Sequence, residues 1–363
     1  MIRRLAFAAG TVVVSALTLR RVARRIADRM VDAPRVLPEE PAMAVALDGL
    51  GGEVIRFRSR DGLRLGGRWL AGSGDEGDGW RPDPHEAILL LHGWSGSVAP
   101  DIVEYGPFLR RTAAVLGIDF GGHGDSDAAP TTFGHREVED VAGALAWLGE
   151  RGVRRVAIFA TSMGGMTAIA SIGVLGDGSL AGVDAEPDAP LAPRPPHRPR
   201  IVAAVLDSVV PELELLVSRR IPGSPGRLLG RLALDEMARR LGADPRATEP
   251  IRMIGLTEGV PLLLITGSGD ERLGPDDAAR LVAAGGPDVE HWEVVGAGHS
   301  AGHATDSDAY EARVTAMLRR AFAGARPHDP IIGATSARMA TPVAVSSSDD
   351  AIESGSDGRP PPS

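Results

Sequence analysis

The chain has 363 residues, 43% of them apolar, and a formal charge of −9 at pH 7. This length suits one large domain or two ordinary ones, and the negative charge argues against a nucleic-acid backbone as the main partner. The chain has no cysteine, which excludes disulfides, thiolate catalysis and Cys-ligated metal centres. All 39 Lys or Arg positions are arginine, so lysine nucleophiles and P-loops are excluded as well.

The N-terminal segment is apolar and then strongly basic. Residues 5–19 form an uncharged apolar run with arginines on both sides. As a helix this run would be about 22 Å long, shorter than the ~30 Å hydrocarbon core of a bilayer, so spanning would need thinning of the bilayer or snorkelling of the arginines. In the next stretch Val22, Ile26 and Met30 are four residues apart among arginines, which is typical of a basic amphipathic helix at an anionic membrane surface.

Residues 1–35 are therefore predicted to attach the protein to a membrane, through residues 5–30. If residues 5–19 span it, the excess of arginine after the run leaves the main body in the cytoplasm. The alternative is a soluble cytoplasmic protein with a leader of no functional consequence. The oligomeric state stays open.

Between residues 45 and 325 the pattern predicts one α/β domain. Residues 55–58 and 63–65 alternate apolar and polar around Asp61-Gly62, which favours an antiparallel hairpin. Helical periodicity is clearest at residues 138–148 and 310–322. Short apolar runs, several of them continuous enough to be strands buried on both faces, are at residues 87–91, 113–119, 154–160, 201–206, 260–266 and 290–295.

This alternation predicts a mostly parallel, doubly wound sheet with an antiparallel N-terminal hairpin. Ligands of such sheets bind beyond the carboxyl ends of the strands. A Pro-rich stretch at residues 176–200 is expected to be an exposed insertion, and the Ser/Pro/Asp-rich tail at residues 326–363 is expected to be disordered. The apolar residues of 211–259 favour either a small helical lid over the site or ordinary core packing.

A candidate nucleophile follows the predicted strand at residues 154–160. Residues 160–165 read Ala-Thr-Ser-Met-Gly-Gly, which is the Gly-x-Ser-x-Gly nucleophile elbow with alanine in the first position. The turn is so tight that only small residues fit two before and two after the serine. Ser162 would then lie at the positive end of a helix, and the backbone N–H of Met163 would be free to stabilise an oxyanion. The alternative is a serine that caps an ordinary helix.

A serine hydroxyl becomes a good nucleophile only when a positioned base takes its proton. Asp270 follows the run at residues 260–266, and His299 follows the run at residues 290–295. Both are therefore expected at the carboxyl edge of the sheet. Asp207, which follows the run at residues 201–206, is the alternative acid.

With the order Ser162, Asp270, His299, the chain resembles the α/β-hydrolase superfamily from about residue 53 to residue 322. The segment His92-Gly93-Trp94 is similar to the His-Gly-x oxyanion loop of that family. This resemblance implies that the Trp94 backbone N–H is the second oxyanion donor, beside that of Met163.

A second loop also resembles the family. Residues 119–126 are similar to its Asp-x-Arg-Gly-x-Gly-x-Ser segment, except that Gly121 replaces the usual arginine. That loop generally braces the site rather than reacting, so the departure puts local packing in doubt and not catalysis.

These residues predict a serine hydrolase that cleaves carboxylic esters through an acyl-enzyme, with a small-molecule ester or acyl compound as its substrate and no cofactor. Acyltransferase, thioesterase, peptidase and perhydrolase activities use the same triad, and a non-catalytic scaffold with this fold is a further alternative. No metal site is expected: His299 and His303 have the i, i+4 spacing of a helical metal pair, but Gly298 and Gly302 disfavour a regular helix there.

Overall fold

The computed structural model describes most of the domain and omits several segments. The described residues are 2–33, 41–75, 77, 79–94, 96–175, 198–221 and 223–324, with the side chains of residues 2–16 and 41 left out. Most of the expected insertion at residues 176–200 and the whole tail at residues 326–363 lie outside this part.

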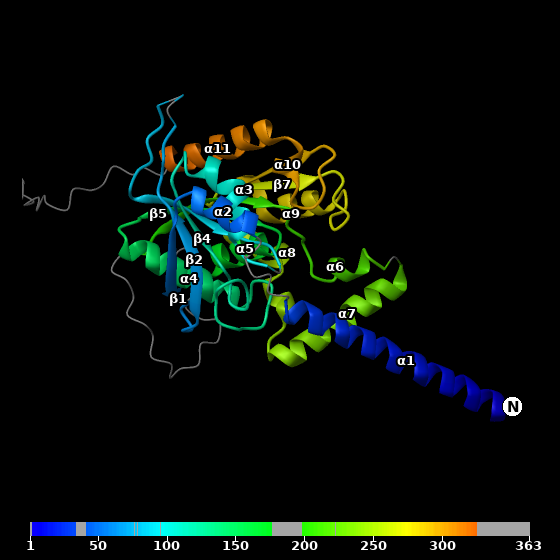
Figure 1. The fold of residues 1–363 in the computed structure, drawn as a ribbon. Coiled ribbons are helices and arrows are strands. Elements are labelled where there is room, and N and C mark those ends of the chain that lie inside the picture. Colours follow the sequence, from blue (N-terminus) through cyan, green and yellow to red (C-terminus); the bar gives the residue numbers. More distant parts are fainter. Residues whose placement is uncertain are drawn as a thin grey trace, which may run out of the picture. The chain divides into compact units, whose positions relative to one another are not determined.

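An eight-stranded sheet forms the centre of the fold (Figure 1). The strand order is β1-β2-β4-β3-β5-β6-β7-β8, with β1 and β2 antiparallel to each other, β2 antiparallel to β4, and the remaining neighbours parallel. The predicted fold class is thus confirmed, including its antiparallel hairpin. The strands are β1 (Glu53–Arg58), β2 (Arg64–Leu70), β3 (Glu86–Leu91), β4 (Ala114–Ile118), β5 (Arg155–Thr161), β6 (Arg200–Asp207), β7 (Leu262–Gly267) and β8 (Val289–Val294).

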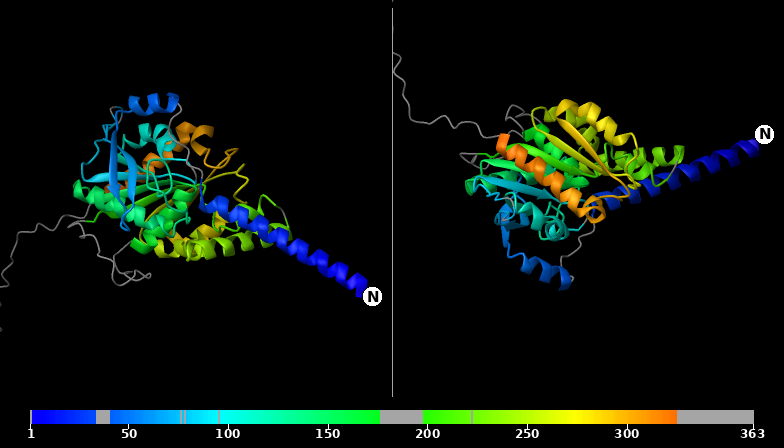
Figure 2. Two further views of the ribbon diagram at one scale, coloured as in Figure 1. Left: turned by 60° about the horizontal axis from the view of Figure 1, so that its bottom comes forward. Right: turned by 90° about the horizontal axis from the view of Figure 1, so that it is seen from above.

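Helices cover both faces of the sheet, as the two turned views show (Figure 2). The sequence favours this because every βα crossover between parallel strands places its helix on one face or the other. The helices are α1 (Ile2–Val31), α2 (Pro41–Gly49), α3 (Ala99–Leu109), α4 (Glu137–Glu150), α5 (Met163–Leu175), α6 (Leu215–Ser218), α7 (Ser224–Leu241), α8 (Pro250–Met253), α9 (Asp277–Gly285), α10 (Gly302–Thr305) and α11 (Ser307–Gly324), with short 3₁₀ turns η1 (Pro245–Thr248), η2 (Ile254–Thr257) and η3 (Gly286–Asp288).

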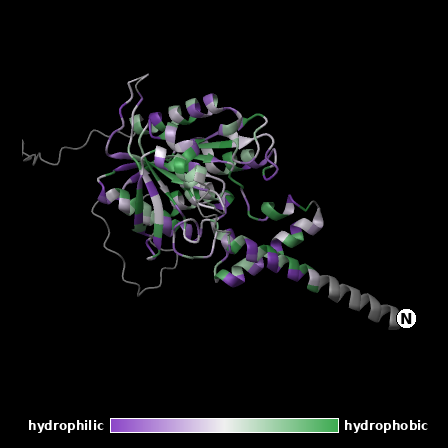
Figure 3. Ribbon diagram, viewed as in Figure 1, coloured by the Kyte–Doolittle hydropathy of each residue, from purple (hydrophilic) through white to green (hydrophobic). Residues whose placement is uncertain are grey.

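The core consists of two apolar layers separated by the sheet. In β3 the side chains of Ala87, Leu89 and Leu91 enter the layer shared with α4 and α5, whereas Ile88 and Leu90 enter the layer shared with α3 and α11. The two-residue alternation of a strand sends successive side chains to opposite faces. The continuous apolar runs of the sequence are therefore the strands buried on both sides, and they are the green ribbons at the centre of Figure 3.

The segment predicted as a lid folds into helices, and part of its apolar content joins the core. Leu213, Leu229, Leu234 and Met237 are buried in the same layer as α5, while Leu228 is exposed. Ordinary core packing accounts for those four buried side chains.

The second half of α1 packs against the domain. Its buried face, which includes Ala23, Ala27 and Met30, lies against α7 and the core layer of α5. Arg240 of α7 bonds to Asp28 at 2.8 Å and to Asp32 at 3.2 Å. Of the face that was expected to meet lipid, Met30 is buried and Ile26 is partly buried against the domain, whereas Val22 is exposed, so the interpretation of residues 22–30 as a membrane-surface helix is unsupported.

Among the described residues, no helix combines the length and the apolar character needed to cross a bilayer. A membrane span at residues 5–19, which the sequence left open, is therefore unsupported, and the side chains of residues 2–16 lie outside the described part.

Candidate active site

Ser162 lies in a strained turn between β5 and α5. Its φ of 48° is in the left-handed region, which is rare for a residue with a side chain. The turn is so tight that a side chain at Gly164 would collide with the backbone of Leu91 and His92. The Ser162 N–H donates to the carbonyl of Asp207 at 2.8 Å, which ties the turn to the end of β6.

The structure brings the three predicted side chains together. The Nε2 atom of His299 is 2.8 Å from Oγ of Ser162, and its Nδ1 atom is 2.7 Å from Oδ2 of Asp270. The imidazole therefore accepts from the serine hydroxyl while donating to the carboxylate. The Asp270 side chain is fully buried and that of His299 is 13% exposed, so bulk water reaches the imidazole only at its edge.

Asp270 is held in its ionised form. Burial by itself would raise the pKa of this carboxyl, but the hydrogen bonds that it accepts, above all the one from His299, outweigh burial and lower the pKa below its usual value. The Arg272 N–H also donates to Oδ1 at 2.8 Å. Each carboxylate oxygen of Asp270 thus accepts a hydrogen bond, and the carboxylate that orients the imidazole is held in place.

Asp207, the alternative acid, does not bond to His299. Its Oδ2 accepts from the Tyr310 hydroxyl at 2.7 Å and its Oδ1 from the Ser208 hydroxyl at 2.8 Å. Burial raises the pKa of the Asp207 carboxyl. Sequence reasoning missed this buried network because Ser208 and Tyr310 belong to no recognisable motif.

The loop after β3 lies beside Ser162. A Cβ atom added to Gly93 would be 3.5 Å from the Cβ of Ser162, so this loop approaches the nucleophile closely. Met163 is the first residue of α5, and a backbone N–H at that position has no partner within its helix. The Trp94 indole N–H donates to the carbonyl of Met30 at 3.1 Å, which fixes this loop from the side of α1.

His92 has a structural position behind this loop. Its Nδ1 lies 2.7 Å from the carbonyl of Gly93, and its Nε2 accepts from the Phe120 N–H at 3.2 Å. Burial lowers the pKa of His92 to about 3, so the ring is neutral and joins two loops without titrating near neutral pH.

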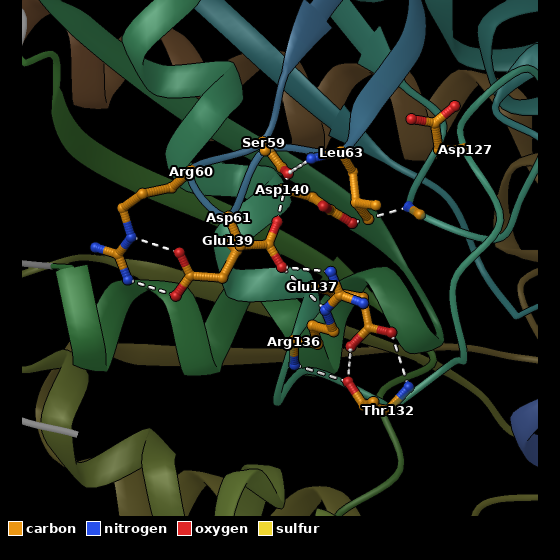
Figure 4. A network of polar contacts seen from close by, with 12 residues as sticks. Ser59, Arg60, Asp61, Leu63, Asp127, Thr132, Arg136, Glu137, Glu139 and Asp140 are labelled. Atoms are coloured by element: carbon orange, nitrogen blue, oxygen red, sulfur yellow. Dashed lines mark hydrogen bonds and ion pairs between the residues drawn. The ribbon is translucent and has the colours of Figure 1, made fainter. Parts of the chain in front are cut away.

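The loop containing Gly121 is braced without the arginine that the family resemblance implies. The Gly121 N–H donates to the carboxyl of Asp140 at 2.9 Å, and a Cβ at Gly121 would be 2.9 Å from Leu63. A larger residue there would require the Leu63 side chain to move. Figure 4 shows the surrounding polar network, in which Glu137 accepts from both the N–H and the hydroxyl of Thr132.

His303 has carboxylate partners and no metal-ligand cluster around it. It begins the single turn α10 with Gly302, and its two ring nitrogens are each 3.3 Å from a carboxylate, one of Glu104 and one of Glu311. Within the described part of the chain, no group of three or more His, Asp or Glu side chains could hold a metal ion.

Comparisons with known proteins agree with this architecture. The model of the alpha/beta hydrolase family matches residues 88–316, and no curated protein matches the chain. An esterase of Pyrococcus furiosus is similar in structure at 20% identity and a TM-score of 0.54, over 80% of this chain and 98% of that one. An alpha-beta hydrolase of Vibrio vulnificus is similar at 18% identity and a TM-score of 0.57, over 80% and 92%. An alpha/beta hydrolase of a Penicillium species has 17% identity and a TM-score of 0.53, over 75% and 99%.

Proposed function

Because the chain belongs to the alpha/beta hydrolase family, we propose that it cleaves carboxylic esters through Ser162, His299 and Asp270. The observation that carries this proposal is the unbroken pair of hydrogen bonds from the serine hydroxyl through the imidazole to a buried carboxylate. A nucleophile, a base within reach of its proton and a third group that orients the base are the parts that acyl transfer needs.

In the first half-reaction, Oγ of Ser162 attacks the ester carbonyl as its proton passes to Nε2 of His299. The negative charge that develops on the carbonyl oxygen is stabilised by the backbone N–H groups of Met163 and Trp94, and one such donor contributes a few kcal/mol. Collapse of the tetrahedral species breaks the ester C–O bond. The imidazolium gives its proton to the departing alcohol, which leaves an acyl group on Ser162.

In the second half-reaction, water replaces the alcohol. His299 takes a proton from that water as the water oxygen adds to the acyl carbon. The imidazolium then returns the proton to Oγ of Ser162 as the carboxylic acid leaves. Asp270 remains ionised throughout, since its pKa lies below the usual value, and its charge stabilises the imidazolium in both halves.

The substrate class is an acyl or alkyl ester of modest size. The segment between residues 211 and 259 is expected to set its chain length, because it is the largest helical addition between the strands that carry the proposed nucleophile and acid.

The test combines active-site labelling with turnover. We expect the wild type to react with a fluorophosphonate probe and to hydrolyse p-nitrophenyl esters, and the Ser162→Ala variant to do neither. Ser171→Ala is the matched control, since it removes a buried hydroxyl of α5 that has no hydrogen-bond partner in the described structure. If purified Ser162→Ala retained wild-type turnover, the proposal would be wrong; activity only on thioesters or aminoacyl substrates would replace the substrate class and keep the triad.

A further inference from the structure

Two residues at the end of β6 contact all three segments that carry the proposed triad. The carbonyl of Asp207 accepts from the Ser162 N–H at 2.8 Å, and the N–H of Ser208 donates to Ile265 of β7 at 2.8 Å. The Ser208 hydroxyl accepts from the N–H of Ser300 at 2.8 Å. Residues 207 and 208 thus lie between the nucleophile, the strand leading to the acid and the residue next to the imidazole.

The three serines in this arrangement share an unusual backbone conformation. Ser162, Ser208 and Ser300 have φ values of 48°, 60° and 51°, all in the left-handed region. Residues with side chains persist in that region only when their surroundings over-determine it. The hydrogen bonds of residues 207 and 208 are part of the surroundings that hold these serines in the left-handed region.

Asp207 sets the direction of the Ser208 hydroxyl. A hydroxyl has one hydrogen to donate, and that of Ser208 goes to Oδ1 of Asp207. Its lone pairs therefore face the Ser300 N–H. The second oxygen of Asp207 accepts from Tyr310 of α11, so the carboxyl itself is held in place. All three side chains are buried, which removes water as a competing partner.

We propose that Asp207 and Ser208 are positioning residues that set the separation between the Ser162 hydroxyl and the His299 imidazole. The inference rests on the proposed function, because it concerns the same reaction. Asp207 holds the Ser208 hydroxyl as an acceptor, and that hydroxyl fixes the backbone at Ser300. His299 is joined directly to Ser300, so holding this backbone fixes the point from which the imidazole reaches Oγ of Ser162, while Asp270 orients the ring.

Removing this brace should slow the chemical step with little effect on substrate binding. Misplacing a reacting group by about 1 Å can lower a rate by on the order of a hundredfold. For Ser208→Gly we therefore expect kcat to fall about ten- to a hundredfold and KM to stay within about twofold. Glycine is chosen because it accepts the φ of 60° without strain, so the CH2OH group is lost without a backbone penalty.

Two variants of Asp207 separate positioning from a role of its charge. In Asp207→Asn the amide oxygen can still accept from the Ser208 hydroxyl, and the amide NH2 can donate to the Tyr310 hydroxyl oxygen. We therefore expect the kcat of this variant to stay within about threefold of the wild type. Asp207→Ala removes both contacts, and its kcat should fall as far as that of Ser208→Gly. If charge mattered instead, both variants would lose activity equally.

The experiment measures kcat and KM on p-nitrophenyl butyrate, together with thermal unfolding, for the full chain and these variants. Ser171→Ala is the control for loss of a buried hydroxyl, and Ser162→Ala tests the proposed function in the same assay. Unchanged kcat in Ser208→Gly beside an inactive Ser162→Ala would overturn the positioning role alone. A fall in kcat matched by a rise in KM, or by loss of folded protein, would also overturn it. An active Ser162→Ala would instead reject the proposed function.

Discussion

The indole of Trp94 caps the helix that precedes the domain. Its Nε1–H donates to the carbonyl of Met30 at 3.1 Å, and the neighbouring carbonyl of Val31 accepts from the N–H of Thr131 at 2.8 Å. The last carbonyls of a helix have no partner within it, so the end of α1 is completed by two loops of the domain. One of these loops also carries the backbone N–H that we propose as an oxyanion donor.

Replacing Trp94 by phenylalanine should therefore reduce activity. The apolar packing is largely kept while the hydrogen bond to Met30 is lost, so we expect kcat to fall about three- to tenfold and the free energy of unfolding to fall by about 1 kcal/mol. Steady-state kinetics and thermal unfolding measure the two effects. Trp80→Phe is the control, because its indole bonds to the carbonyl of Thr112 away from the candidate site. Equal kcat values for the two variants would contradict the prediction.

Substituting each candidate acid by asparagine should distinguish the two. In Asp270→Asn the imidazole loses the charge that stabilises its protonated form, and we expect kcat to fall on the order of 10⁴-fold, the loss typical of this substitution in Ser-His-Asp triads. Asp207 has no bond to His299, so Asp207→Asn should lose no more than about threefold. Both variants are assayed with the same p-nitrophenyl ester. A loss in Asp207→Asn as large as that in Asp270→Asn would contradict the assignment of Asp270 as the acid.

The buried carboxyl of Asp140 should make stability depend on pH. Burial raises its pKa to about 8, so the folded protein keeps a proton that the unfolded chain releases above its ordinary pKa near 4. Wild-type stability from this group is therefore present at low pH and is lost as pH rises towards 8. Asparagine still accepts from the Gly121 N–H and has no proton to lose.

We therefore expect Asp140→Asn to gain stability relative to the wild type between pH 5 and pH 8, by up to about 4 kcal/mol. Thermal unfolding at both pH values measures this difference. Asp48→Asn, at an exposed position of α2, is the control for removing a carboxylate. A stability difference that stays constant with pH would show that Asp140 is ionised in the folded state.

Adding a methyl group at Gly164 should damage the turn that presents Ser162. The new Cβ would collide with the backbone carbonyls of Leu91 and His92, which cannot move without shifting β3. Overpacking of this kind costs about 1–3 kcal/mol, so we expect Gly164→Ala to lower both the unfolding temperature and kcat. Gly49→Ala, where nothing lies within 4 Å of the added atom, should be neutral. Wild-type stability of Gly164→Ala would disprove the close approach.

Much of the fold follows from local patterns in the sequence. The apolar runs at residues 87–91 and 154–160 correspond to β3 and β5, because strands buried on both faces need apolar side chains at every position. Asp61-Gly62 marks the β1–β2 hairpin because the turn needs a residue with positive φ, and Gly62 has a φ of 96°. The ends of the parallel strands differ by at most two residues from the prediction, whereas β2 continues five residues beyond it, as pairing with neighbours decides where a ladder stops.

The partner of an apolar face could not be predicted in the same way. The spacing of Val22, Ile26 and Met30 defines one side of a helix, yet it carries no information on whether lipid or protein covers that side. In the structure the domain buries Met30 and partly buries Ile26, while Val22 is exposed. The ion pairs of Arg240 with Asp28 and Asp32 join segments that are about two hundred residues apart.

By itself the sequence determined which groups would gather at one edge of the sheet. Ser162, Asp270, His299 and Asp207 all follow parallel strands or their connecting turns, and the carboxyl ends of such strands lie side by side. Only the tertiary structure decided which carboxylate meets the imidazole. That choice depends on the turns after β6 and β7, where contacts with distant residues such as Tyr310 direct one side chain away and leave the other within 2.7 Å of the ring.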